Sequence, residues 1–155
     1  MITTYSGLYR YNMLDVVKVV DFIGRTPIIV FCGKSSDRLI VDGKTIYGYQ
    51  IADAAQVVEG QLGIEFDLVQ AFVTDNGYAV MLETKNQVNY DVLKQTIGQV
   101  AKAQCGYVPD TIYIMDHQYK DSLFTERTRI DRGACGIKLP IVISEVPKQH
   151  IMQVL

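Results

Sequence analysis

The chain has no run of apolar residues that approaches the roughly 18 needed to cross a membrane as a helix. Its opening residues, MITTYSGLYRY, contain neither the basic n-region nor the apolar h-region of a secretory signal. It also contains no linker rich in Gly, Pro or Ser, no low-complexity segment and no internal repeat. With 155 residues, we therefore expect one globular domain, with no membrane partner.

An excess of positive charge is absent as well. The 15 Lys and Arg residues are scattered among 17 Asp and Glu residues, so no nucleic-acid partner is expected. The 3 cysteines are odd in number and widely spaced, which indicates reduced thiols in the cytoplasm rather than a disulfide framework. Neither of the 2 histidines lies near a cysteine at a metal-ligand spacing, so we expect no metal site within the chain.

Self-sufficient catalytic motifs are also missing. Gly33-Lys34-Ser35 looks like the end of a phosphate-binding loop, but that motif requires glycine at the position of Ile28. The chain has no dinucleotide-binding G-x-G-x-x-G, no G-x-S-x-G nucleophile elbow and no His-Glu-x-x-His. An independent enzyme built on a cysteine or a carboxylate stays open as an alternative without a local signature.

Alternating helix and strand patterns predict the fold class. Helices are expected at 50–60, 90–105 and 121–131, and strands at 66–74, 78–82 and 112–115. Before them, short extended pieces are expected at 5–11, 16–23 and 28–32, and 137–143 is expected to be extended. From about 37 to 116 the order is β-α-β-β-α-β. We therefore predict an α+β, ferredoxin-like sandwich with an N-terminal β-arm and a C-terminal helix plus extended tail.

Three sequence blocks carry a family resemblance. The run GLYRYNMLDVVKV at 7–19 is similar to the third nucleotide-binding motif of the auxin-responsive acyl acid–amido synthetases, approximately GLYRYxxGDVVxV. The following FIGRTPIIVF at 22–31 and the later RGACGIKLP at 132–140 resemble two further segments of that family, in the same order. A fourth stretch, from Gly33 to Ile46, resembles the hinge motif of the wider acyl-adenylate-forming superfamily.

The resemblance implies a function and a partner. It implies the C-terminal swivelling domain of an ATP-dependent ligase, which closes over an acyl-AMP formed on a large N-terminal adenylating domain, in cis or in trans. Residues 1–36 would be a β-arm and hinge, and 37–155 the lid, within one domain. ATP and Mg would be held only together with the large domain, and the isolated chain would be inactive.

The resemblance also implies roles for individual residues. Lys138 matches the lysine that neutralises charge as the acyl-adenylate forms. Asp15 matches the carboxylate that accepts from the ribose hydroxyls, with Arg10 and Tyr11 beside it on the nucleotide. Lys34 and Asp37 fall on the hinge.

Two departures from the family pattern favour another interpretation. Leu14 stands where the family has glycine, and glycine permits a positive φ or a close approach to the nucleotide. Ile141 stands where the family has arginine, which removes a possible anion contact. The alternative is a stand-alone degenerate domain that acts as a protein-interaction or small-ligand binding module without catalysis.

Overall fold

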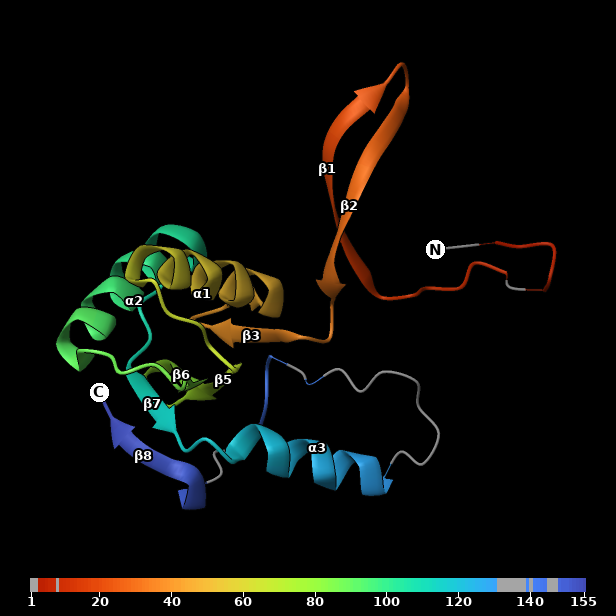
Figure 1. Cartoon of the computed structure of the whole chain (residues 1–155). Coiled ribbons are helices and arrows are strands. Elements are labelled where there is room, and N and C mark those ends of the chain that lie inside the picture. Colours follow the sequence, from red (N-terminus) through yellow and green to blue (C-terminus); the bar gives the residue numbers. More distant parts are fainter. Residues whose placement is uncertain (1–2, 8, 131–138, 140, 145–147) are drawn as a thin grey trace.

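The computed structural model describes residues 3–7, 9–130, 139, 141–144 and 148–155. In these parts, a β-hairpin projects from an α+β body (Figure 1). None of the described helices is both long enough and apolar enough to cross a membrane.

The projecting hairpin is formed by β1 (Asp15–Ile23) and β2 (Thr26–Lys34). Its β-branched residues favour the extended conformation, and Gly24 makes the turn with φ 61°. The predicted strands at 16–23 and 28–32 are thereby confirmed. The extended piece predicted at 5–11 is wrong, because residues 5–7 form a turn and Arg10 has a left-handed φ of 50°, which no strand accommodates.

A second hairpin leads into the first helix. It pairs β3 (Arg38–Val41) with β4 (Lys44–Tyr47) across Asp42 and Gly43, whose φ values of 51° and 74° are those of an Asp-Gly hairpin turn. The helix α1 (Gly48–Leu62) follows directly. It ends at Gly63, which adopts φ 65° and donates its N–H to the Glu59 carbonyl over 2.9 Å.

The main sheet has the strand order β5-β6-β7-β8. β5 (Leu68–Thr74) and β6 (Gly77–Glu83) form a hairpin, and β7 (Thr111–Met115) runs parallel to β6. β8 (Ile151–Val154) pairs antiparallel with β7 after a short 3₁₀ turn at Lys148–His150. Between β6 and β7 lies α2 (Tyr90–Cys105), whose first turn is capped by the Asn89 side chain and which ends at Gly106.

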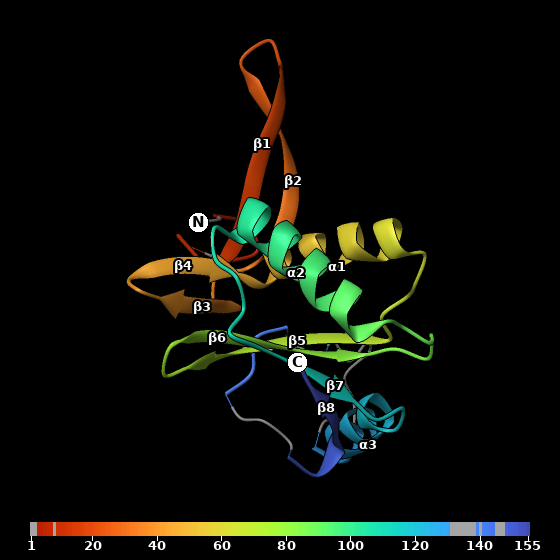
Figure 2. The same ribbon diagram turned by 90° about the vertical axis from the view of Figure 1, so that its left-hand side faces the viewer.

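The sheet is covered on both faces. Helices α1 and α2 lie on one face, and α3 (Tyr119–Ile130) lies on the other (Figure 2). Along β6, Tyr78, Val80 and Leu82 pack toward α1 and α2, while Ala79 and Met81 belong to the smaller core beneath α3. Because both faces are buried, β6 is a continuous apolar run rather than an alternating one.

The predicted α+β class, the element order and the three helices are confirmed. The sheet differs from a single ferredoxin-like sheet, because β3 and β4 pair only with each other and β7 takes the place beside β6. β8 was not predicted. Of the tail expected at 137–143, residues 137, 138 and 140 lie outside the described part, and 141–143 runs beside β5 with a parallel bridge between Val142 and Ala71.

Candidate functional site

Two residues predicted for different roles meet at the base of the projecting hairpin. Asp15 begins β1 and Lys34 ends β2, and the two are direct partners in the strand register. The Lys34 ammonium forms an ion pair with the Asp15 carboxylate and also donates to the Met13 carbonyl over 3.0 Å. The side chains of Lys34 and Asp15 are 53% and 21% exposed, so water and salt screen the pair, which contributes at most about 1 kcal/mol.

Asp37 connects this ion pair to a distant part of the chain. Its N–H donates to the Lys34 carbonyl over 3.1 Å, and its own carbonyl accepts from the Gly48 N–H over 2.8 Å. One carboxylate oxygen, Oδ1, accepts from the N–H of Val142 over 2.8 Å, across 105 residues of sequence. A continuous path of contacts therefore runs from Asp15 through Lys34 and Asp37 to Val142. We call these four residues the hinge junction, after the predicted hinge motif on which Lys34 and Asp37 fall.

The segment joined to the junction continues the sheet. The Ile141 carbonyl accepts from the Ala71 N–H over 2.7 Å, and the Ile143 N–H donates to the Ala71 carbonyl over 2.9 Å. Ile141, which replaces the arginine of the family pattern, packs against the main core. Lys138 lies outside the described residues, three positions before Ile141 in the sequence.

Arg10 and Tyr11 lie apart from the junction. Both are exposed in the irregular segment before β1, and the Arg10 N–H donates to the Thr3 hydroxyl over 3.2 Å. Within the described residues, no hydrogen bond or ion pair joins either side chain to Asp15.

Leu14 adopts the backbone conformation that glycine would favour. Its φ is 57°, its N–H donates to the Asn12 side-chain oxygen over 3.0 Å, and its carbonyl accepts from the Ser35 N–H over 2.7 Å. The backbone geometry implied by the family glycine is therefore retained, while a side chain now occupies a left-handed position. Such a position costs a non-glycine residue about 1–2 kcal/mol.

Replacing Leu14 with glycine is expected to stabilise the isolated chain. Relief of the left-handed strain outweighs the entropy that glycine adds to the unfolded state, and we expect the free energy of unfolding to rise by about 0.5–1 kcal/mol in a urea titration. The matched control is Val19→Gly, at a similarly exposed position of β1. This substitution should lower the free energy of unfolding. A destabilised Leu14→Gly chain would contradict this interpretation of the backbone.

The projecting hairpin is apolar on both of its faces. Large apolar side chains that are more than a third exposed occur along both strands: Val17, Val19, Val20, Phe22, Ile23, Ile28, Ile29, Val30 and Phe31. Since successive residues of a strand point to opposite faces, Ile28 and Val30 lie on one face of β2 and Ile29 and Phe31 on the other. A contiguous exposed apolar surface of this kind marks an interaction site.

Residues 1–34 match the family model described as the GH3 family central domain. A probable indole-3-acetic acid-amido synthetase, GH3.1, from Oryza sativa subsp. japonica is 43% identical over 42 residues, which are 27% of this chain and 7% of the relative. Over this N-terminal stretch the chain is similar to the GH3 family.

Solved structures extend the likeness over the whole fold. GH3.15 acyl acid amido synthetase superposes with a TM-score of 0.74 at 18% identity, over 98% of this chain and 32% of that one. A mutant form of coronafacic acid ligase from Pectobacterium brasiliense gives a TM-score of 0.50 at 10% identity, over 92% of this chain and 25% of the ligase. The chain thus shares the fold of about a third of the GH3.15 enzyme.

The GH3 likeness raises the question of how much of a nucleotide site the chain holds. Asp15 presents a partly accessible carboxylate, which fits the two hydroxyl donors of a ribose. In the described residues, however, no group of three or more His, Cys, Asp or Glu side chains could hold a metal ion.

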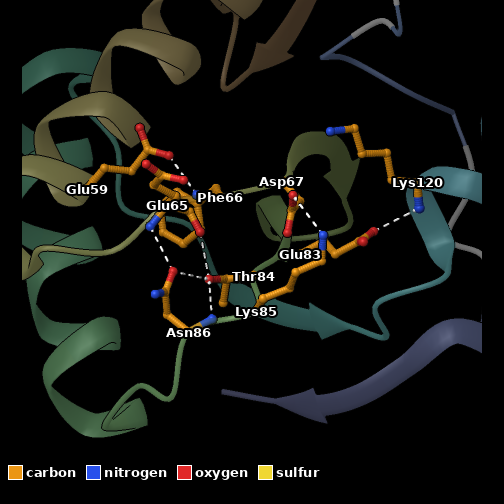
Figure 3. Close-up of polar contacts among 9 residues, drawn as sticks. All are labelled: Glu59, Glu65, Phe66, Asp67, Glu83, Thr84, Lys85, Asn86 and Lys120. Atoms are coloured by element: carbon orange, nitrogen blue, oxygen red, sulfur yellow. Dashed lines mark hydrogen bonds and ion pairs between the residues drawn. The ribbon is translucent and has the colours of Figure 1, made fainter.

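A buried polar cluster beneath α3 was missed by the sequence analysis. The Glu83 side chain is almost fully buried, and its carboxylate accepts from the Lys120 N–H in the first turn of α3 over 2.8 Å (Figure 3). Nearby, the Tyr119 hydroxyl donates to the buried Gln70 side-chain oxygen over 2.9 Å, and burial raises the pKa of Tyr119 to about 12. The sequence feature that could have revealed this cluster is Glu83 itself. It is a glutamate at the end of an apolar strand, on the same face as Ala79 and Met81.

The pKa values of two carboxylates near the start of α3 are shifted in opposite directions. Burial raises the pKa of Glu83 above its ordinary value, although the hydrogen bond from Lys120 acts against this. The pKa of Asp116 is lowered, mainly by the hydrogen bond with His150, whose Nδ1 lies 2.9 Å from the carboxylate. These groups attach α3 and β8 to the sheet.

The Glu83→Gln substitution is expected to stabilise the chain at neutral pH. Because the folded-state pKa of Glu83 is raised, its stabilising contribution is present below the ordinary carboxyl pKa and is lost as the pH rises through the folded value. Glutamine removes the buried charge and retains an acceptor for Lys120. Urea unfolding should show the variant to be more stable at pH 7, with a difference that shrinks toward about pH 4.

The control for this pH series is Glu65→Gln, at an exposed position in the loop before β5. A Glu83→Gln variant that is less stable than the parent at pH 7, or a difference that does not change with pH, would contradict the assignment of buried charge to Glu83.

Proposed function

We propose that the chain is the C-terminal swivelling domain of an ATP-dependent acid–amido synthetase of the GH3 type. It closes over an acyl-adenylate that is formed on a large N-terminal adenylating domain, in cis or in trans. The observation that carries this proposal is the hinge junction, in which residues matching the ribose and hinge motifs are in contact at the base of an uncovered apolar hairpin.

The large domain is the partner that the hairpin requires. An apolar hairpin exposed on both faces needs a partner that covers both, and residues 1–34 resemble a segment that belongs to the central domain in GH3 proteins. The chain spans 32% of the solved GH3.15 synthetase, so the rest of such an enzyme would supply the phosphate-binding loop, the acyl pocket and the Mg site.

The proposed roles of the residues follow from their chemistry. Asp15 accepts hydrogen bonds from the ribose hydroxyls, and Arg10 and Tyr11, in the segment before β1, contact the nucleotide once the large domain is bound. Lys138 brings a positive charge to the α-phosphate as negative charge accumulates during adenylation. Lys34 and Asp37 form the hinge on which the lid, residues 37–155, turns relative to the arm at 1–36.

Calorimetric titration of ATP and of AMP separates the contribution of this chain from that of its partner. We expect negligible binding to the isolated chain, because the phosphate-binding loop, the acyl pocket and the Mg site would lie on the large domain. We expect binding once the large domain is present. Tight binding of ATP to the isolated chain would overturn the proposal.

The second candidate is a stand-alone module that binds a protein or a small ligand without catalysis. The Asp15–Lys34 ion pair favours it, since a carboxylate already paired with an ammonium is a weaker acceptor for a ribose. Lys34→Ala distinguishes the two candidates. If the chain is part of a ligase, Lys34→Ala should alter the KM for ATP of the assembled protein. If the chain is a binding module, neither the parent nor the variant should show adenylation.

A further inference from the structure

The hinge junction contains a contact that neither the family motif nor the proposed function requires. Asp37 is the one residue of the junction whose side chain reaches beyond the hinge, to the N–H of Val142. Its backbone is engaged at the same time, through Lys34 on one side and Gly48 on the other. A single residue thus joins the hinge, the start of α1 and the segment 141–143.

The segment 141–143 packs its side chains against the two cores, Ile141 and Val142 against the larger and Ile143 against the smaller. Its pairing with the sheet consists of the two hydrogen bonds to Ala71, at the outer edge of β5. So short a pairing is marginal by itself, whereas a hydrogen bond to a charged acceptor is among the stronger ones. The Asp37 carboxylate therefore adds a charge-assisted hydrogen bond to the two that Ala71 makes with the backbone of this segment.

The absence of a side chain at Gly48 leaves room for the Asp37 carboxylate. A Cβ at Gly48 would lie 2.3 Å from Oδ2 of Asp37, which is closer than any real contact. The position leaves room for the carboxylate and for nothing larger than hydrogen. Since Gly48 is also the first residue of α1, the carboxylate lies where the helix dipole favours negative charge.

We propose that Asp37 is a latch that couples the hinge to the segment 141–143. While the hinge has the conformation seen here, the carboxylate holds that segment against β5. A change in the backbone dihedral angles of Asp37 redirects its side chain, and the segment is released. This inference rests on the proposed function. In it, Asp37 is a positioning residue that couples rotation of the lid to the segment 141–143, which follows the closing motif at 132–140.

Hydrogen exchange of the isolated full chain tests the latch without any catalysis. In Asp37→Ala, and independently in Gly48→Ala, we expect the amides of Val142 and Ile143 to exchange at least tenfold faster, while Leu93 in α2 is unchanged. Asp37→Asn, which keeps an acceptor oxygen, should lie between them and the parent. The controls are Asp53→Ala and Gly60→Ala, both at exposed positions of α1. A Cβ added at Gly60 would meet no other atom within 4 Å.

Unchanged exchange at Val142 in both Gly48→Ala and Asp37→Ala would overturn the latch. In the assembled protein, a released latch should change the ratio of the adenylation rate to the amide-forming rate at least fivefold, whereas a merely structural role lowers both rates in proportion. Faster exchange in a protein that has no ligase activity would support the latch and reject the proposed function. Normal exchange and an unchanged ratio in an active ligase would reject the latch alone.

Discussion

Lys138→Ala is expected to reduce ATP–pyrophosphate exchange by the assembled protein by roughly a hundred- to a thousandfold. Removing one group that stabilises developing charge in a closed active site typically costs this factor. The KM for the carboxylic acid should change little, because acyl selection would lie in the large domain of the proposed ligase. Exchange of radiolabelled pyrophosphate into ATP reports the adenylation step without the amide-forming step.

Two variants make this result specific to the lysine. Lys94→Ala, at an exposed position of α2, removes one positive charge from the lid and should leave the exchange rate unchanged. Lys138→Arg keeps the charge and should retain part of the activity, since the guanidinium is larger and is fixed in plane. Full activity in Lys138→Ala would show that the closing motif has another role here.

The second large effect concerns the projecting hairpin. The double substitution Ile29→Ser and Phe31→Ser replaces two exposed apolar side chains on one face of β2. If that face is buried against the large domain, the loss is about 3 kcal/mol, which is roughly a hundredfold in affinity. Sedimentation or calorimetry with the separately produced large domain measures the change.

The hairpin variants need a control that is equally apolar and equally exposed. Ile40→Ser on β3 meets this requirement, because Ile40 is 56% exposed and lies outside the hairpin. It should leave the affinity unchanged. Since the hairpin side chains are uncovered in the isolated chain, the double variant should remain folded, as circular dichroism will show. Unimpaired association would mean that the hairpin docks elsewhere or not at all.

Local patterns predicted most of the elements. Helix α2 has an N-cap asparagine, a terminal glycine and an apolar stripe in the right places, and its predicted bounds of 90–105 match the structure. The Asp-Gly turn at 42–43 and the return of β5 into β6 likewise depend on a few adjacent residues. These features are set by short-range chemistry, which a single sequence contains.

The parts that escaped prediction depend on distant partners. The four residues of β8 become a strand because β7 offers them an edge, and Val142 is hydrogen-bonded to a residue 105 positions earlier. The sheet order is another such case, since either β4 or β7 could follow β6 by pattern alone. Which one does so is decided by packing on both faces of the sheet.

The candidate site lies between these two cases. The meeting of Asp15 with Lys34 could have been predicted, because the two residues are equally far from the turn at 24–25 and therefore oppose each other in the hairpin. Their separate assignment, one to the ribose and the other to the hinge, obscured this. The link from Asp37 to Val142 carries no sequence signal and required the structure.

The central claim is that this chain completes a nucleotide site whose other half lies on a large adenylating domain. Its most direct test is ATP–pyrophosphate exchange by that large domain, measured as the chain is added in increasing amounts. We predict that the exchange rate rises and saturates at one chain per large domain. A rate that is the same at every concentration of the chain would contradict the account.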